Sequence, residues 1–179
     1  SQDPDRCVRV VKERDDGIVV RGARFNTFGI FSNEILISPT YMFNEDEAEF
    51  ALWFTVPSNA PGLKQVAREV FSGRNPMDHP VSARFDEVDS LAIFDDVFVP
   101  WERVFLYREP LAANRLFRGN VMSWASYAGS VLTQLRMEVL VAVAHLLAVT
   151  SGVDKRPNVV STLGEMCTYL SLARSNLRA

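Results

Sequence analysis

The spacing of apolar residues changes once along this chain, and that change limits the folds available to it. Up to about residue 107, short runs of β-branched and aromatic residues alternate with turn sequences rich in Gly, Pro, Asn and Asp, a pattern typical of β-strands. After Pro110 the density of Gly and Pro falls, and apolar residues recur about every 3.6 positions, which predicts helices. We therefore expect an α+β chain with a β domain at 1–108 and a helical domain at 109–179.

The β domain is expected to begin with a hairpin. Asp16-Gly17 separates two strand-like runs, and an Asp-Gly pair in such a place is a strong signal for a tight type I′ turn. Asp95-Asp96 is interpreted as another turn pair, which separates two short strands. The strands expected from the pattern lie at 7–13, 18–24, 34–38, 50–56, 63–70, 91–94 and 97–100.

The helical domain is predicted as a pair of helices. Residues 111–150 form one long helix or two, and Ser151-Gly152 ends the run because glycine is favoured just past a helix end. Pro157 then opens a further helix, whose pattern continues to 178 without a cap, so we expect a longer parent protein. The pair alone would expose much apolar surface, so we also expect a homo-oligomer, either a dimer or a tetramer.

Charge and cysteine usage argue against several classes of protein. The 22 acidic and 19 basic residues are interspersed, with no basic stripe, so no nucleic-acid partner is expected. Cys7 and Cys167 lie far apart, which argues against a disulfide scaffold or a cysteine-bound metal and fits a reducing compartment. The longest apolar run, 139–149, contains His145 and is shorter than the roughly 20 residues that cross a bilayer. We expect a cytoplasmic protein with no membrane partner and no metal.

Several motifs resemble a known family. Residues 16–24 are similar to the first hairpin of the middle β-barrel in the acyl-CoA dehydrogenase superfamily, and residues 94–100 are similar to the end of that barrel. Within the superfamily, three motifs resemble the oxygenase components of 4-hydroxyphenylacetate 3-monooxygenases and their relatives that act on phenols and chlorophenols. These motifs are Asp78-His79-Pro80, Arg84-Phe85-Asp86-Glu87 and Val99-Pro100-Trp101-Glu102. The likeness covers nearly the whole chain.

The resemblance implies a two-component, reduced-flavin-dependent monooxygenase. A separate flavin reductase would supply FADH2, and the oxygenase would use O2 to hydroxylate a phenolic small molecule at the ortho position. The family architecture consists of an N-terminal helical domain, a middle β-barrel and a C-terminal helical bundle that builds a tetramer. By this resemblance, the chain would be the acyl-CoA dehydrogenase-like middle β-barrel followed by the first helices of the bundle, a fragment that lacks the N-terminal domain.

The resemblance also suggests flavin-contacting residues. A threonine shortly after the hairpin glycine contacts the flavin in the family, and here Asn26-Thr27 is the candidate, with Ser32 as a further hydroxyl contact. Thr27 follows Gly22 one residue earlier than is usual, so either a bulge absorbs the difference or the contact has moved. A hydroxyl beside the flavin can donate or accept a hydrogen bond as the ring changes redox state. The alternative interpretation is a threonine at a strand edge that pairs with the backbone.

Asp78 and His79 are the candidate substrate-binding residues. Histidine exchanges protons near neutral pH, so this pair could line the substrate entrance or hold the phenol hydroxyl. The alternative, which we favour, is that both residues pin their loop through hydrogen bonds. Arg84 with the nearby Asp86, Glu87 and Asp89 is interpreted as an ion-pair network at a turn. The sequence assigns no catalytic residue.

Two other functions stay open. The first is a flavin-dependent acyl-CoA dehydratase or dehydrogenase of the same fold; the dehydratases hold an iron–sulfur cluster with cysteines and a histidine. No cysteine neighbours His79 in this chain, although such ligands could lie elsewhere in a longer parent. The second is a non-catalytic role, in which the β domain and its helices serve as a structural or assembly module.

Overall fold

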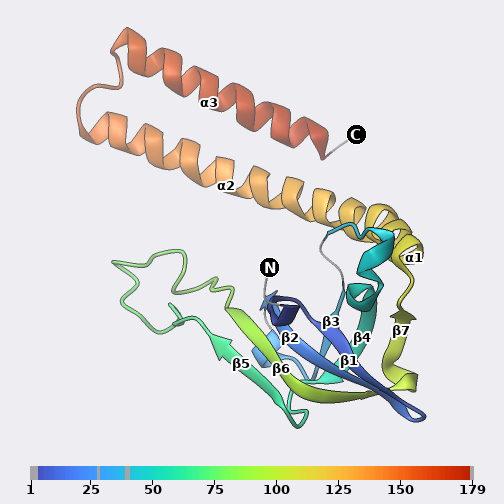
Figure 1. Cartoon of the computed structure of the whole chain (residues 1–179). Helices are drawn as coiled ribbons and strands as arrows, with labels where there is room; N and C mark the ends of the chain where they lie inside the picture. The colour runs from blue at the N-terminus through green and yellow to red at the C-terminus, as the bar shows by residue number, and fades with distance from the viewer. Residues whose placement is uncertain (1–3, 28, 39–40, 178–179) are drawn as a thin grey trace. The chain divides into compact units, whose positions relative to one another are not determined.

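The computed structural model describes residues 4–27, 29–38 and 41–177, and it divides the chain into two compact units at 1–117 and 118–179 (Figure 1). The first unit holds the seven strands and helix α1 (Pro110–Leu116). The second holds helices α2 (Met122–Thr150) and α3 (Pro157–Asn176), which pack against each other. Sequence alone places the boundary at 108/109, ahead of α1. In the structure α1 contacts the 3-10 helix η3 (Glu45–Phe50), so it lies with the strands.

Two antiparallel sheets form the first unit. The larger has the order β1-β2-β6-β5 and the smaller has the order β3-β4-β7. The larger sheet is made of β1 (Arg9–Arg14), β2 (Gly17–Thr27), β6 (Asp89–Pro100) and β5 (Leu63–Ala67). The smaller is made of β3 (Glu34–Ile37), β4 (Leu52–Pro57) and β7 (Val104–Tyr107). Short 3-10 helices complete the unit: η1 (Pro4–Arg6), η2 (Gly29–Phe31) and η4 (Trp101–Arg103).

The core of the strand unit lies between the inner faces of the two sheets. Alternate residues of each strand point inward, as the period of a β-strand requires. Phe54 of β4 and Phe94 of β6 meet there edge to face, with ring centroids 5.9 Å apart. The other fully buried members of this core are Ile18, Val20, Val56, Ala92, Val97 and Val99.

The expected closed β-barrel is not formed, and this corrects the sequence-based expectation. The described strands make two separate sheets, whose edges are β1 and β5 in one and β3 and β7 in the other. Closure would need ladder pairing between these edges. The edge strands β3 and β7 have four residues each, and among the described strands neither pairs with β1 or β5. The architecture is therefore an open arrangement of two packed sheets.

Strand β6 is continuous where the sequence suggests two strands separated by a turn. Val20 pairs with Val97 and Gly22 pairs with Phe94, so a single residue of β2 faces two residues of β6. Such a two-against-one pairing is a β-bulge, which lets a strand bend without ending. Asp96 adopts a left-handed φ of 53° there, a conformation that aspartate tolerates better than most residues. Asp95-Asp96 is thus a bulge and not a turn.

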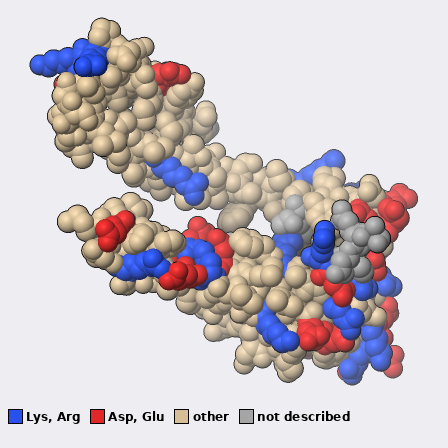
Figure 2. Space-filling view, turned by 60° about the vertical axis from the view of Figure 1, so that its left-hand side comes forward, with Lys and Arg blue, Asp and Glu red and all other residues tan. Residues whose placement is uncertain are grey.

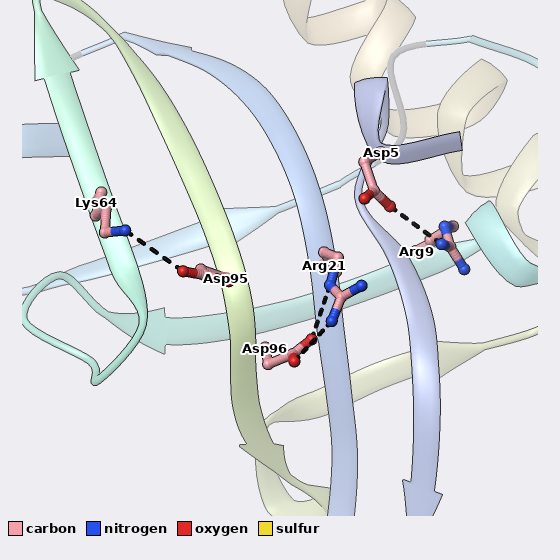
Figure 3. A network of polar contacts seen from close by, with 6 residues as sticks. All are labelled: Asp5, Arg9, Arg21, Lys64, Asp95 and Asp96. Atoms are coloured by element: carbon pink, nitrogen blue, oxygen red, sulfur yellow. Dashed lines mark hydrogen bonds and ion pairs between the residues drawn. The ribbon is translucent and has the colours of Figure 1, made fainter. Parts of the chain in front are cut away.

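Ion pairs on the outer face hold this bulge (Figure 3). Arg21 of β2 donates two hydrogen bonds to the Asp96 carboxylate, at 2.9 Å from Nε and 2.7 Å from Nη2. These bonds, with the charge of Arg21, lower the pKa of Asp96. Lys64 of β5 lies 3.4 Å from Asp95 on the other side of β6. The bulge is therefore tied to both neighbouring strands.

The first hairpin is confirmed, but its turn is one residue earlier than expected. Arg14 pairs with Gly17, so Asp15 and Asp16 form the turn, and neither has the positive φ of a type I′ turn. Gly17 is the first residue of β2, and a larger residue does not fit there because a Cβ would lie 2.8 Å from the Cα of Pro100. The sequence signal was correct for the hairpin and wrong for the role of its glycine.

The helices follow the sequence-based expectation. The run that begins with α1 continues through a π-helical turn, Phe117–Val121, into α2, and it ends at Gly152, whose φ is +67°. Pro157 begins α3 as expected, and Arg174 of α3 donates to Glu138 of α2 at 3.0 Å.

The helical run carries a long apolar surface. By length and apolar composition, Pro110–Thr150 could cross a membrane: its most apolar window has a mean hydropathy of 1.5, and 6% of that window is buried. The core helix of a soluble protein can have the same length and hydropathy, so these two properties are weak evidence for a membrane span. Figure 2 shows few charged side chains over the visible face of the helical pair, in contrast to the strand unit. Apolar residues of α2 therefore lie exposed in this chain taken alone.

The bulge gives a first testable prediction, at Gly22. Its φ is +128°, and a Cβ there would lie 2.6 Å from the carbonyl carbon of Cys7. We expect Gly22→Ala to lower the free energy of unfolding by about 3 kcal/mol, because backbone strain and a clash with backbone act together. The measurement is urea unfolding followed by circular dichroism.

Gly73 provides the matched control for this substitution. Its φ is also positive, at +81°, but no atom lies within 4 Å of the Cβ position. Gly73→Ala should therefore cost only about 1 kcal/mol, from φ alone. Equal losses in the two variants would show that crowding at Gly22 does not matter.

Candidate functional site

The inner face of the larger sheet changes from apolar to polar toward one end. Along the β2–β6 ladder, the inward pairs Ile18–Val99 and Val20–Val97 are aliphatic and fully buried. Further along, Arg24 pairs with Ala92 and Asn26 pairs with Ser90. Polar residues at core-facing positions are uncommon and indicate a site that binds or positions something.

Gln65 of β5 joins this end of the sheet, because it pairs with Ala92 from the other side. We call Arg24, Asn26, Gln65 and Ser90 the inner polar row. Ser90 Oγ donates to the Asn26 carbonyl at 3.3 Å, and Gln65 Nε2 donates to the Ser58 carbonyl at 3.4 Å. Ser90 is only 2% exposed. The row is thus a polar cluster at the end of the core, in which Ser90 is buried and Arg24, Asn26 and Gln65 are half-buried.

Two atoms of the inner polar row lack a partner among the described residues. These are the donor Asn26 Nδ2 and the acceptor Gln65 Oε1, and both are buried. Gly29 of η2 lies directly over them, since a Cβ there would overlap the Asn26 amide. A buried amide atom without a partner is costly, so a further polar group is expected to complete this cluster.

A cavity of about 350 Å³ opens beside Arg24, between the ends of the two sheets. Its floor is apolar and includes the buried Ile37, Phe43 and Leu52. The polar groups at its wall come from three different segments: Arg6 and Cys7 before β1, Arg24 in β2, and Ser38 and Tyr41 after β3. A cavity of this size with few polar groups is typical of a small-molecule site.

The electrostatics of the cavity are set by burial. Burial lowers the pKa of the Arg24 guanidinium, a group that nevertheless stays protonated in proteins. Burial, with the neighbouring Cys7 and Glu47, raises the pKa of Tyr41 to about 12. At neutral pH the cavity wall therefore presents a cation and a neutral phenol that can donate a hydrogen bond.

The structure places the predicted flavin contacts at the same end of β2. Asn26 belongs to the inner polar row, whereas Thr27 is described only by its backbone, which ends β2 and pairs with Asp89. The side chain of Thr27 lies outside the described part of the chain. Ser32 Oγ donates to the Gly29 carbonyl at 2.9 Å and so closes the η2 turn. All three stay predictions as flavin contacts.

Asp78 and His79 lie in the long loop between β5 and β6, and neither lines the cavity. Asp78 Oδ2 accepts from Asn75 Nδ2 at 2.9 Å. The His79 ring is tilted against Phe71 at 5.3 Å, and its backbone N–H donates to the Asn75 carbonyl. These contacts agree with the interpretation that both residues pin the loop, and their role toward substrate stays a prediction.

The same loop is anchored by Asp86, whose partner differs from the one expected. Arg68, rather than Arg84, donates to Asp86 Oδ1 at 2.6 Å, and the Phe71 N–H donates to Oδ2 at 2.6 Å. The bond from Arg68, then that from Phe71, lowers the pKa of Asp86, whose side chain is 5% exposed. Arg84 instead stacks on Phe85, 5.7 Å from the ring centroid. The expected ion-pair network exists with a different arginine.

Sequence reasoning missed Arg24, Tyr41, Gln65 and Ser90. The signal for Arg24 was its alternation with Gly22 and Asn26, which places a charged residue on the inner face of a strand. The inward alternation of β2 runs unbroken from Ile18 to Asn26, because the extra residue of the bulge belongs to β6. Tyr41, Gln65 and Ser90 carry no motif. Gln65 and Ser90 become apparent from strand register, and Tyr41 becomes apparent from the lining of the cavity. Among the described residues, no three His, Cys, Asp or Glu side chains are grouped so that they could hold a metal.

Comparison with known sequences gives a consistent result. The family described as 4-hydroxyphenylacetate 3-hydroxylase N terminal matches residues 1–106. A 4-hydroxyphenylacetate 3-monooxygenase oxygenase component from Thermus thermophilus is 37% identical over 175 residues, 97% of this chain and 36% of the relative. A FADH(2)-dependent monooxygenase from Burkholderia cepacia is 31% identical over 96% of this chain and 33% of its own length. The chain spans about a third of the length of these relatives.

Solved structures agree with the sequence matches. An oxygenase component of 4-hydroxyphenylacetate 3-monooxygenase complexed with FAD and 4-hydroxyphenylacetate superimposes with a TM-score of 0.87 at 36% identity, covering 99% of this chain and 38% of that one. An archaeal 4-hydroxybutyryl-CoA dehydratase from N. maritimus gives 0.78 at 26% identity, covering 96% and 35%. A probable acyl-CoA dehydrogenase from Mycobacterium abscessus gives 0.59 at 16% identity, covering 99% and 45%, a likeness of fold alone.

Asp86 gives the prediction from this region. Because the pKa of Asp86 is depressed, its anchoring of the loop is present above the pKa that it has in the unfolded chain, and it is lost as pH falls through the folded pKa. Asp86→Asn should therefore raise the rate of limited proteolysis within residues 72–84 several-fold at pH 7, and acidification of the unaltered protein should have the same effect.

The exposed neighbour Glu87 is the control, because only its backbone carbonyl is engaged by Arg68. Glu87→Gln should leave the cleavage rate unchanged. Equal rates in the Asn variant and the unaltered protein at pH 7 would contradict the anchoring role of Asp86.

Proposed function

This chain belongs to the 4-hydroxyphenylacetate 3-hydroxylase family, and we propose that its full-length protein is the oxygenase component of a two-component monooxygenase. The reaction would place a hydroxyl group ortho to the hydroxyl of a phenolic small molecule. Reduced FAD from a separate flavin reductase and O2 would be consumed. The chain described here would supply one wall of the site.

One observation carries this proposal. The inner polar row lies at the open end of a core that is otherwise aliphatic, next to a cavity with an apolar floor. An aromatic hydroxylation site needs this combination: apolar walls that hold a ring and keep out water, and a few polar groups that fix its orientation.

The residues present fit a flavin. Asn26 Nδ2 and Gln65 Oε1 are a buried donor and a buried acceptor without partners among the described residues, and the flavin ring carries both acceptors and a donor along one edge. Asn26 and Gln65 would hold or position that edge, with Thr27 and Ser32 as the further candidate contacts. When bound, reduced FAD supplies the electrons that activate O2.

The chain's own residues would act on the substrate by binding and orientation. Phe43 and Leu52 would exclude water from one side of the ring. The Tyr41 hydroxyl stays protonated at neutral pH and would donate a hydrogen bond to a substrate oxygen. Asp78 and His79 remain proposed at the substrate entrance, although their contacts in the structure are within the loop.

The assembly of the protein is also a proposal. Many apolar residues of α2 are exposed in this chain, such as Leu135 at 52% and Leu146 at 62%, which favours their burial against further chain and other subunits in a dimer or homotetramer. The free cysteines Cys7 and Cys167 are consistent with a cytoplasmic location.

A dehydratase of the same fold is the second candidate. Its support is the superposition on the archaeal 4-hydroxybutyryl-CoA dehydratase at 26% identity. The monooxygenase relatives are closer, at 37% identity for the Thermus thermophilus protein. We therefore retain the monooxygenase as the proposed function.

The test uses the full-length protein with a flavin reductase, NADH, FAD, O2 and a phenol such as 4-hydroxyphenylacetate. The expected result is a catechol product that incorporates one atom of ¹⁸O2, identified by mass spectrometry. Oxidation of reduced FAD with only hydrogen peroxide as product, across a panel of phenols, would contradict the proposed activity.

Asn26 gives a residue-level prediction. Asn26→Ala should weaken binding of reduced FAD about tenfold, the loss of roughly 1.4 kcal/mol expected for one buried hydrogen bond. Ser32→Ala should weaken it less, by about twofold, because the Ser32 hydroxyl already donates to the Gly29 carbonyl and could only accept a hydrogen bond from the flavin. Anaerobic titration of each variant with reduced FAD measures both values, and an unchanged affinity in Asn26→Ala would refute the assignment.

A further inference from the structure

The side-chain amide of Gln65 has an orientation that its hydrogen bond imposes. Its Nε2 donates to the Ser58 carbonyl at 3.4 Å, and a carbonyl oxygen can only accept. Ser58 is itself held in place, because its backbone N–H donates to the Asn33 carbonyl at 3.0 Å and its hydroxyl donates to the Ser32 carbonyl at 2.5 Å. Turning the amide over would set its oxygen against the Ser58 carbonyl. Gln65 therefore presents Oε1, an acceptor, on the side away from Ser58.

The space beside this acceptor is kept clear of side chains by a glycine. A Cβ at Gly29 of η2 would lie 3.1 Å from Gln65 Oε1 and would overlap the Asn26 amide. The Ser32 hydroxyl donates to the Gly29 carbonyl and holds the η2 turn over both amides. Gln65 Oε1 is buried and has no partner among the described residues, and such an acceptor is costly unless a donor meets it. The cluster therefore favours a ligand that brings an N–H or O–H group to Oε1.

One atom on the edge of the flavin ring changes its hydrogen-bonding character with redox state. The nitrogen N5 accepts a hydrogen bond in the oxidised ring, whereas in the reduced ring it carries a hydrogen and donates. The neighbouring carbonyl oxygen O4 accepts in both states. Protein hydrogen bonds to the ring nitrogens are among the means by which a site tunes a flavin. A fixed acceptor at N5 therefore favours the reduced ring, and a fixed donor at O4 binds both states.

We propose that Gln65 is the residue by which this site distinguishes reduced from oxidised FAD, with Oε1 accepting a hydrogen bond from the N5–H group that only the reduced ring carries. This inference rests on the proposed function, since it takes the flavin to bind at the inner polar row. Asn26 Nδ2 donates to the flavin carbonyl O4, a contact that is present in both redox states. In the oxidised ring the lone pair of N5 faces Oε1, which weakens binding. The site thus takes up reduced FAD and releases oxidised FAD, as exchange with a separate reductase requires.

The test measures the affinity of the full-length protein for reduced and for oxidised FAD, by anaerobic titration with each form. The unaltered protein should bind the reduced form about tenfold more tightly or better. Gln65→Met keeps the length of the side chain and removes the acceptor, so it should weaken reduced FAD about tenfold and leave oxidised FAD within about twofold. The midpoint potential of the bound flavin should then fall by about 30 mV, the equivalent of a tenfold change for a two-electron couple.

Two variants separate this role from a general effect on the site. Asn26→Ala should weaken both forms of FAD alike and leave the midpoint potential unchanged, because O4 accepts in both states. Val66→Thr is the matched control on β5: Val66 follows Gln65, points to the opposite face of the sheet and is 58% exposed. It should leave both affinities and the potential unchanged.

A change in the ligand tests the same contact in the unaltered protein, so the proposal can be tested even where Gln65→Met is unstable. In 5-deaza-FAD a carbon replaces N5, and its reduced ring has no N–H group at that position. The unaltered protein should lose its preference for the reduced form of this analogue. In 1-deaza-FAD the nitrogen N5 is retained, and the preference should be kept.

Three results would overturn the proposal: no preference for reduced FAD in the unaltered protein, an equal loss of both forms in Gln65→Met, or a preference for the reduced form that persists with 5-deaza-FAD. Unchanged affinities in Gln65→Met would show that the two amides pair with each other and not with the flavin, which also overturns it. A Gln65-dependent preference without hydroxylation of any phenol would contradict only the proposed function. Hydroxylation by a protein whose flavin affinities do not depend on Gln65 would contradict only this inference.

Discussion

The antiparallel pairing of β2 with β6 is the constraint on which the rest of the structure depends. It fixes which side chains of two long strands face the core, and a shift of one residue would reverse every one of them. The bulge at Asp95-Asp96 adds one residue to β6, and its ion pairs with Arg21 and Lys64 keep the two halves of the ladder in register. The aliphatic half then packs the core, and the polar half forms the site.

The position of the site is set by the end of the β2–β6 ladder that lies beyond the aliphatic core. Asn26 and Ser90 form one of its last inward pairs, and η2 returns over them with a glycine because no larger residue fits against the Asn26 amide. Cys7, which precedes β1, and Tyr41, which follows β3, both line the cavity beside Arg24. The chemistry proposed for this end of the sheet thus depends on backbone register as much as on the identity of the side chains.

Much of the fold could be predicted from local patterns, and much of the site could not. The hairpin, most strand positions and the helix boundaries near Gly152 and Pro157 are local signals, and the structure confirms them; β7 (Val104–Tyr107) was not among the expected strands. The continuity of β6 was missed because a bulge and a turn share the same Asp-Asp sequence. The pairing of Asp86 with Arg68 and the place of Gln65 depend on contacts between strands, which no single segment encodes. The expected barrel came from resemblance to a family, and in this chain the described strands form two sheets that are not joined.

The central claim is that the polar end of the β2–β6 ladder forms a wall of a joint flavin and phenol site. The most direct measurement is a crystal structure of the full-length protein with FAD and a phenolic acid bound. The account predicts the flavin edge within hydrogen-bonding distance of Asn26 or Gln65, and the phenol ring against the apolar floor of the cavity beside Arg24. Both ligands bound away from the inner polar row and its cavity would contradict the account.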